Sequence, residues 1–221
     1  MSEVPREFVG LARDFVERVH KENEATLRVV RRVEATVIEP RIGGRGKHTL
    51  RPEHVRQIER IWRDMPETFR IGPTVFDHPK HGLRIEEMRL QALRRNLGDW
   101  TDRDKKEPAI AVSVMLATVE RKEGWHYRWR EYITIGLHAL ARRYERGDGR
   151  DDAAILRDIE ALVDASCELA KSDSDLSEVA IPCGCRWRGT VSMADVFGTS
   201  GRLHESHASL AIRTFLPPIL R

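Results

Sequence analysis

The sequence predicts a mainly α protein, with a helical, bundle-like body and a small C-terminal β-hairpin (α+β by strict count). Two observations predict this fold. Before residue 172, apolar residues recur mostly three and four positions apart, as in amphipathic helices. From Val179 to Met193 the spacing changes to every second residue, which is typical of a strand with one buried face. The change of period places the β-element at the C-terminus.

Polar and charged stretches suggest where the chain divides. A polar linker lies at 171–177, so we expect a helical body over 1–172 and a C-terminal β-element packed on it over 173–221. A charged linker at 99–107 offers a further boundary inside the helical body.

The N-terminal part predicts two helices. Pro5–Glu39 contains no internal proline and carries apolar residues at helical spacing, so it reads as one long helix or as two joined near Asn23. A second helix begins near Thr49 or Leu50 and ends at Met65, before a proline.

The middle of the chain also reads mainly as helix. Residues 67–83 are broken by prolines and glycines and predict an ordered loop, and Leu83–Leu97 returns to helix. Ala109–Val119 is apolar on nearly all sides and predicts a central helix. An aromatic cluster beginning at Trp125 leads into a helix that ends near Arg146.

The last third predicts one helix and the hairpin. Asp151 or Asp152 caps the cleanest amphipathic helix of the chain. In the first strand of the hairpin, the alternation places Cys183, Cys185 and Trp187 on one buried face.

The basic residues are mostly arginine and are unevenly spread. Of 38 basic residues, 31 are Arg and 7 are Lys. Residues 1–106 hold 23 basic against 18 acidic residues, and residues 107–221 hold 15 against 17. Arginine binds phosphate and carboxylate through paired contacts, so a basic N-terminal half suggests an anionic partner. A genome rich in G and C would also favour arginine codons.

The sequence offers no sign of secretion or membrane insertion. No apolar run follows Met1, no stretch approaches 18 uninterrupted apolar residues, and the three cysteines form an odd number. We therefore expect a cytoplasmic protein with free thiols and no membrane contact.

A basic loop follows the first predicted helix. It combines glycines, which let backbone N–H groups approach phosphates, with cations that neutralise them. It lacks the order of a nucleotide-binding loop, because His48 stands where Ser or Thr is required. The candidate nucleic-acid-binding residues here are Arg41, Arg45, Lys47, His48 and Arg51.

A second candidate site combines aromatic and basic residues. Arg128 and Arg130 alternate with Trp125, Tyr127 and Trp129, which would form a base-stacking platform if the backbone is extended. The alternative is core packing, which is the commoner fate of tryptophan.

A third set has metal-ligand chemistry. Cys183 and Cys185 precede His204 and His207, and thiolate with imidazole suits zinc. In a hairpin that turns near Ser200, however, the two pairs would lie about 30 Å apart at roughly 3.3 Å per residue. We therefore expect structural cysteines, no metal and no cofactor.

These observations favour a non-enzymatic protein that binds nucleic acid, or a nucleoprotein assembly, through its Arg-rich N-terminal half. A protein partner or a homo-oligomer is also expected. Two alternatives stay open: a metal-dependent or nucleolytic enzyme that uses the His and Cys sets, and a helical scaffold or regulator that binds only protein.

Overall fold

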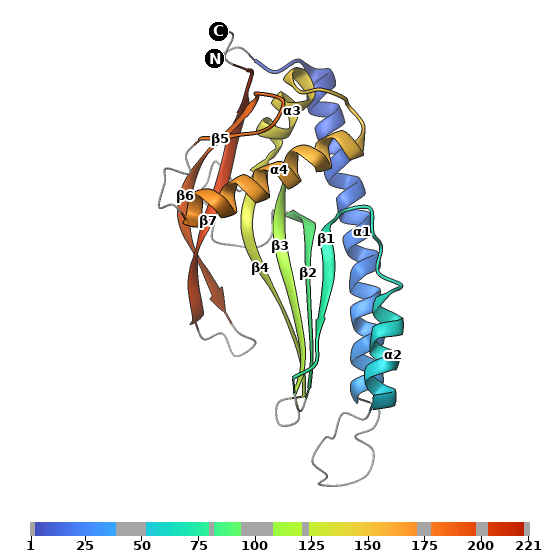
Figure 1. Ribbon diagram of the computed structural model, residues 1–221. Helices are drawn as coiled ribbons and strands as arrows, with labels where there is room; N and C mark the ends of the chain where they lie inside the picture. The colour runs from blue at the N-terminus through green and yellow to red at the C-terminus, as the bar shows by residue number, and fades with distance from the viewer. Residues whose placement is uncertain are drawn as a thin grey trace. The chain divides into compact units, whose positions relative to one another are not determined.

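The computed structural model describes four helices and seven strands (Figure 1). The described residues are 3–38, 52–79, 82–93, 108–120, 124–171, 178–197 and 203–218. The elements within them are α1 (Arg6–Ile38), α2 (Pro52–Trp62), β1 (Arg70–Asp77), β2 (Gly82–Leu93), β3 (Ala109–Glu120), β4 (Gly124–Gly136), α3 (Leu137–Arg146), α4 (Asp152–Lys171), β5 (Glu178–Ala180), β6 (Arg186–Phe197) and β7 (Leu203–Leu216).

The prediction of a mainly α, bundle-like body with a small hairpin is wrong. Among the described residues, strands hold as many residues as helices. The strands form one mixed sheet in the order β1-β2-β3-β4-β7-β6-β5. The β4–β7 pair is parallel, whereas the β1–β2, β5–β6 and β6–β7 pairs are antiparallel.

The chain groups into two compact units, each built from separate stretches of sequence. The first unit comprises Met1–Val19, Leu90–Val112 and Glu131–Arg221, and the second comprises His20–Arg89 and Ser113–Arg130. Each unit is described by itself below.

Helix α1 is a single uninterrupted helix of 33 residues, so the joint considered near Asn23 does not exist. Its buried residues keep helical spacing along its whole length. Phe8, Phe15 and Val19 are buried in the first unit, and Val29 and Val33 are buried in the second. The amphipathic pattern therefore predicted this helix correctly.

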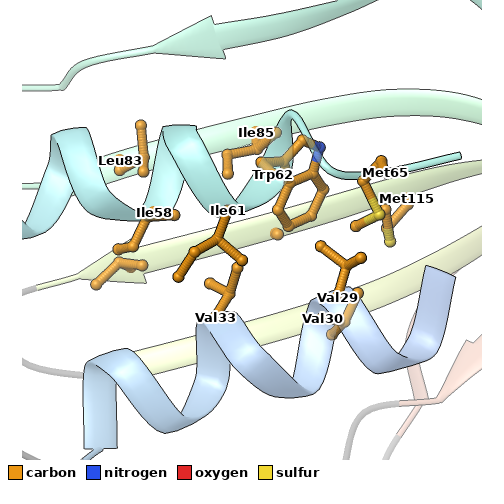
Figure 2. Packing of buried hydrophobic residues seen from close by; sticks show 12 residues of the cluster. Val29, Val30, Val33, Ile58, Ile61, Trp62, Met65, Leu83, Ile85 and Met115 are labelled. Atoms are coloured by element: carbon orange, nitrogen blue, oxygen red, sulfur yellow. The ribbon is translucent and has the colours of Figure 1, made fainter. Parts of the chain in front are cut away.

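The core of the second unit lies between α1, α2 and the strands (Figure 2). Val29, Val30 and Val33 of α1 face Ile61 and Trp62 of α2. From the strands, Leu83, Ile85, Met115, Ala117 and Val119 join the same cluster. Helix α2 runs back along α1 (Figure 1), which brings these two apolar faces together.

Strand β2 occupies part of the segment that was expected to be a helix from Leu83 to Leu97. Its side chains alternate between the two faces of the sheet, so Leu83, Ile85, Glu87 and Arg89 are all buried. Because two of these four inward residues are charged, the period of two is not visible as a hydrophobic alternation.

The partner strands of β2 were also misread. β1 lies in the predicted loop, and β3 occupies the predicted central helix Ala109–Val119. At Gly82, an added Cβ would come within 2.4 Å of the carbonyl oxygen of Val119, so the start of β2 passes against the end of β3 and the pair runs antiparallel.

In β3, four consecutive residues from Ile110 to Ser113 are fully buried. A strand buried on both faces is a continuous apolar run, which periodicity does not separate from a buried helix. The predicted helix ending near Arg146 is half strand, because β4 extends to Gly136 and only Leu137–Arg146 is helical.

The first unit contains the C-terminal elements. Asp151 accepts a hydrogen bond from the backbone N–H of Ala154 (2.8 Å), which confirms that this aspartate caps α4. The buried Arg143 guanidinium closes the turn before α4 by donating to the carbonyl oxygens of Asp148 and Gly149 and to Asp158.

The predicted C-terminal hairpin exists as β6 and β7, with Met193 opposite Ala208 and Trp187 opposite Phe215. The first predicted strand is interrupted, however, because Ile181–Cys185 forms a turn between β5 and β6. Trp187 and Cys185 are buried as expected, whereas Cys183 lies on the turn and is exposed.

None of the helices in the described part of the chain is long and apolar enough to cross a membrane.

Candidate functional site

The outward side of α1 in the second unit carries arginines. Arg31 is two residues from both Val29 and Val33, which is about 200° around the helix from each, so it points away from the core. Arg28, three residues earlier, is its neighbour on the helix surface. Both side chains are exposed.

Helix α2 repeats this arrangement. Arg56 and Arg60 lie two residues on either side of the buried Ile58, so both point away from the core. Arg63 follows three residues after Arg60 and is also exposed. We call the set Arg28, Arg31, Arg56, Arg60 and Arg63 the arginine face.

The acidic residues around the arginine face are mostly engaged elsewhere. Glu22 binds Arg89 (2.9 Å), Glu24 lies 3.2 Å from His20, and Glu59 lies 3.1 Å from His78. Asp64 binds a sixth arginine, Arg32, at 2.9 Å. The other acidic residues of α1 and α2 in this unit are Glu34 and Glu53.

Within the described residues, the five arginines of the arginine face have no ion pair. Like charges three or four residues apart on a helix repel one another by a few tenths of a kcal/mol, roughly 0.2–0.5 per pair. An anion bound across both rows would relieve that repulsion.

The two helices are held in place from below. The fully buried Arg89 donates hydrogen bonds to Glu22 of α1, to Glu87 of β2 and to the Pro66 carbonyl oxygen. Glu22 also accepts the backbone N–H of Phe69 (2.9 Å). These contacts fix α1 to the segment that follows α2.

Helix α2 is fixed to the sheet by its tryptophan. Trp62 donates to Glu87 (3.2 Å) and packs edge-on against Trp125, with ring centroids 6.4 Å apart. The Arg32–Asp64 ion pair links α1 to the turn after α2. The arginine face therefore rests on packed, hydrogen-bonded helices, which fixes the spacing of its charges.

The predicted loop residues Arg41, Arg45, Lys47, His48 and Arg51 lie outside the described residues. In the sequence, they belong to the segment that joins the end of α1 to the start of α2. They therefore remain a prediction.

The candidate residues Arg128 and Arg130 lie on β4, which is extended, so Trp125, Tyr127 and Trp129 share one face of the strand. Trp125 and Trp129 pack partly against the core cluster, which is the alternative considered for them. Because side chains alternate, Arg128 and Arg130 point to the opposite face from the rings.

The candidate metal residues are spread along the C-terminal hairpin. Cys185 precedes Arg186, which pairs with Leu216 at one end of the ladder, whereas His207 pairs with Ala194. The eight residues between these pairs span about 26 Å at roughly 3.3 Å per residue, so the cysteines do not meet His207 and the more distant His204. Within the described residues, no group of three or more His, Cys, Asp or Glu side chains could hold a metal ion.

The sequence analysis missed the arginine face. Its signal is in the sequence, because Arg56, Arg60 and Arg63 recur at spacings of four and three in a predicted helix. Arg28 and Arg31 do the same in the helix before it. What could not be read was that the two rows belong to adjacent helices of one unit.

Comparison with protein-family models, curated proteins and solved structures gave no match. The functional argument therefore depends on the chemistry of the described residues.

Proposed function

We propose that this protein is a non-enzymatic nucleic-acid-binding protein, or a subunit of a nucleoprotein assembly, which contacts the sugar–phosphate backbone through its arginine face. The observation that carries the proposal is the set of five exposed arginines on two packed helices with no ion-pair partner among the described residues. Guanidinium groups bind phosphate oxygens through two parallel hydrogen bonds, and each contact releases counterions from the nucleic acid.

The position of the basic loop supports the same proposal. Because it joins α1 to α2 in the sequence, its cations are tethered to the two helices that carry the arginine face. Loop glycines would let backbone N–H groups reach phosphates, while the helices supply the side chains. This arrangement contacts the backbone rather than the base edges, so we expect little dependence on nucleotide sequence.

The test is a binding titration with labelled single-stranded RNA, single-stranded DNA and duplex DNA of mixed sequence. We expect salt-sensitive binding by the wild-type protein. Replacing Arg56, Arg60 and Arg63 with Ala should weaken it for every sequence to a similar extent. A matched control replaces three exposed arginines of the first unit, Arg13, Arg157 and Arg188, and should bind much more tightly than the α2 variant.

The loop is tested by a second variant in which Arg41, Arg45 and Lys47 are replaced with Ala. It should reduce affinity and lower the salt dependence by up to about three charges' worth, near 0.7–0.9 per phosphate contact. Binding that is unchanged in both triple variants would contradict the proposal. A wild-type protein that binds none of the three probes would leave the protein-scaffold alternative in its place.

A further inference from the structure

The turn between β5 and β6 brings two cysteines together. The backbone N–H of Ile181 donates to the Cys185 carbonyl oxygen (3.0 Å), and that of Gly184 donates to the Ile181 carbonyl oxygen (2.9 Å). The three residues inside this pair are Pro182, Cys183 and Gly184. A three-residue hairpin loop with its last residue in the left-handed region is a common way to join two antiparallel strands.

Gly184 has the conformation that this loop requires. Its φ is +82°, which is open to glycine at no steric cost. The backbone therefore turns between Cys183 and Cys185. Two Cα atoms separated by one residue are at most about 7 Å apart in a straight chain, and a turn shortens this toward the 4.4–6.8 Å that a disulfide needs.

The two thiols have different environments. Cys183 is exposed, whereas Cys185 is buried with 3% of its surface exposed, and its Sγ lies 4.0 Å from the Arg146 carbonyl oxygen. Burial, and then the neighbouring Cys183 thiol, raise the pKa of Cys185 to about 12. At neutral pH the reactive thiolate is therefore supplied by Cys183.

We propose that Cys183 and Cys185 are a reversible redox site, which is oxidised to an internal disulfide by a small-molecule disulfide such as oxidised glutathione. This goes beyond the proposed nucleic-acid binding, since both cysteines belong to the first unit and the arginine face to the second. Either proposal can fail while the other stands.

The reaction has two exchange steps. The Cys183 thiolate attacks one sulfur of the glutathione disulfide, which forms a mixed disulfide and releases one glutathione thiolate. Cys185 then loses its proton and attacks the Cys183 sulfur, which releases the second glutathione. The two protein sulfurs are oxidised, the glutathione disulfide is reduced to two thiols, and the two protein protons pass to these thiols or to water.

Oxidation has a defined structural consequence. The thiol proton of Cys185 is removed, so this sulfur no longer donates toward the carbonyl oxygen of Arg146, the last residue of α3. The Arg146 side chain meanwhile donates to the Phe215 carbonyl oxygen (2.8 Å) of β7. The redox state of the turn is thereby linked to the end of α3.

The experiment uses the full chain with Cys167→Ala, so that Cys183 and Cys185 are its only cysteines. The protein is equilibrated in mixtures of reduced and oxidised glutathione, quenched with acid and weighed by mass spectrometry. We expect both thiols to disappear together, with a mass lower by two hydrogens. A transient glutathione adduct should resolve faster as the pH rises, because Cys185 must ionise.

Two single variants separate the roles. Added Cys185→Ala should stop at one glutathione adduct on Cys183, and added Cys183→Ser should react far more slowly, since the remaining thiol is buried. Cys183 is exposed, so this second variant is expected to fold even if the first does not. A parent protein that keeps its adduct, forms only linked dimers or stays reduced in every mixture would overturn the proposal.

Discussion

At the scale of single residues, the second unit depends on a buried arginine. Arg89 has no exposed surface and lies between two carboxylates, those of Glu22 and Glu87. Glu87 also accepts hydrogen bonds from Trp62 and from Thr74 (2.5 Å). The charges are desolvated but nearly all their polar atoms have partners, which is the condition under which buried ions are tolerated.

Replacing Arg89 with Met should therefore lower the free energy of unfolding by about 3–5 kcal/mol, because it leaves buried carboxylates without their cation. Urea denaturation followed by circular dichroism measures this. The control is Arg84→Met on the same strand, whose half-exposed ion pair with Glu86 is worth about 0–1 kcal/mol. Equal losses of stability in the two variants would show that the network around Arg89 contributes no more than a surface pair.

A buried phenol makes the first unit sensitive to alkali. Burial raises the pKa of Tyr144 to about 12, although Arg18 beside it acts in the opposite direction. The folded state thus holds the phenol proton more tightly than the unfolded state, whose pKa is near 10. The stability gained is complete below about pH 10 and is lost as the pH rises toward 12.

We expect Tyr144→Phe to reduce the loss of stability above about pH 10, as measured by urea denaturation over a series of alkaline buffers. Cys185 contributes in the same direction, since its pKa is also raised, so part of the loss should remain. The exposed Tyr127→Phe is the matched control and should keep the wild-type profile. Identical alkaline profiles for Tyr144→Phe and wild-type would contradict this account.

At the scale of elements, the pattern of inward residues decided what the sequence could predict. The long helix α1 and the C-terminal hairpin show clean periods, and both were predicted. Strand β2 was missed because Glu87 and Arg89 occupy inward positions, so its alternation is hidden. Strand β3 was missed for the opposite reason, since Ile110–Ser113 is buried on both faces and shows no alternation at all.

The hairpin gives a prediction at this scale. Trp187 of β6 is fully buried and packs edge-on against Phe215 of β7, with ring centroids 4.6 Å apart. Trp187→Ala should cost about 3–5 kcal/mol of folding free energy, as other large-to-small changes in cores do. Arg188→Ala, the exposed neighbour, should change it by less than about 0.5 kcal/mol. Thermal denaturation of both variants tests this, and a decrease below about 1 kcal/mol for Trp187→Ala would show that the strands do not depend on this packing.

At the scale of the whole molecule, sequence-distant segments are brought into one unit. The second unit combines His20–Arg89 with Ser113–Arg130, and no local pattern in the sequence indicates that these segments belong together. The charge asymmetry pointed to the N-terminal half, but which arginines share a surface depends on α2 packing beside α1 through Val33, Ile61 and their neighbours. The arginine face therefore became visible only with the fold.

The salt dependence of nucleic-acid binding tests the central claim most directly. For wild-type protein, the log of the affinity for a single-stranded oligonucleotide should fall linearly with log salt. The Arg56→Ala, Arg60→Ala, Arg63→Ala variant should show a slope shallower by about 0.7 for each phosphate that its side chains no longer bind, thus up to about 2. The first-unit control with Arg13, Arg157 and Arg188 replaced should keep the wild-type slope. Equal slopes in all three proteins, or a wild-type affinity that does not change with salt, would contradict the account.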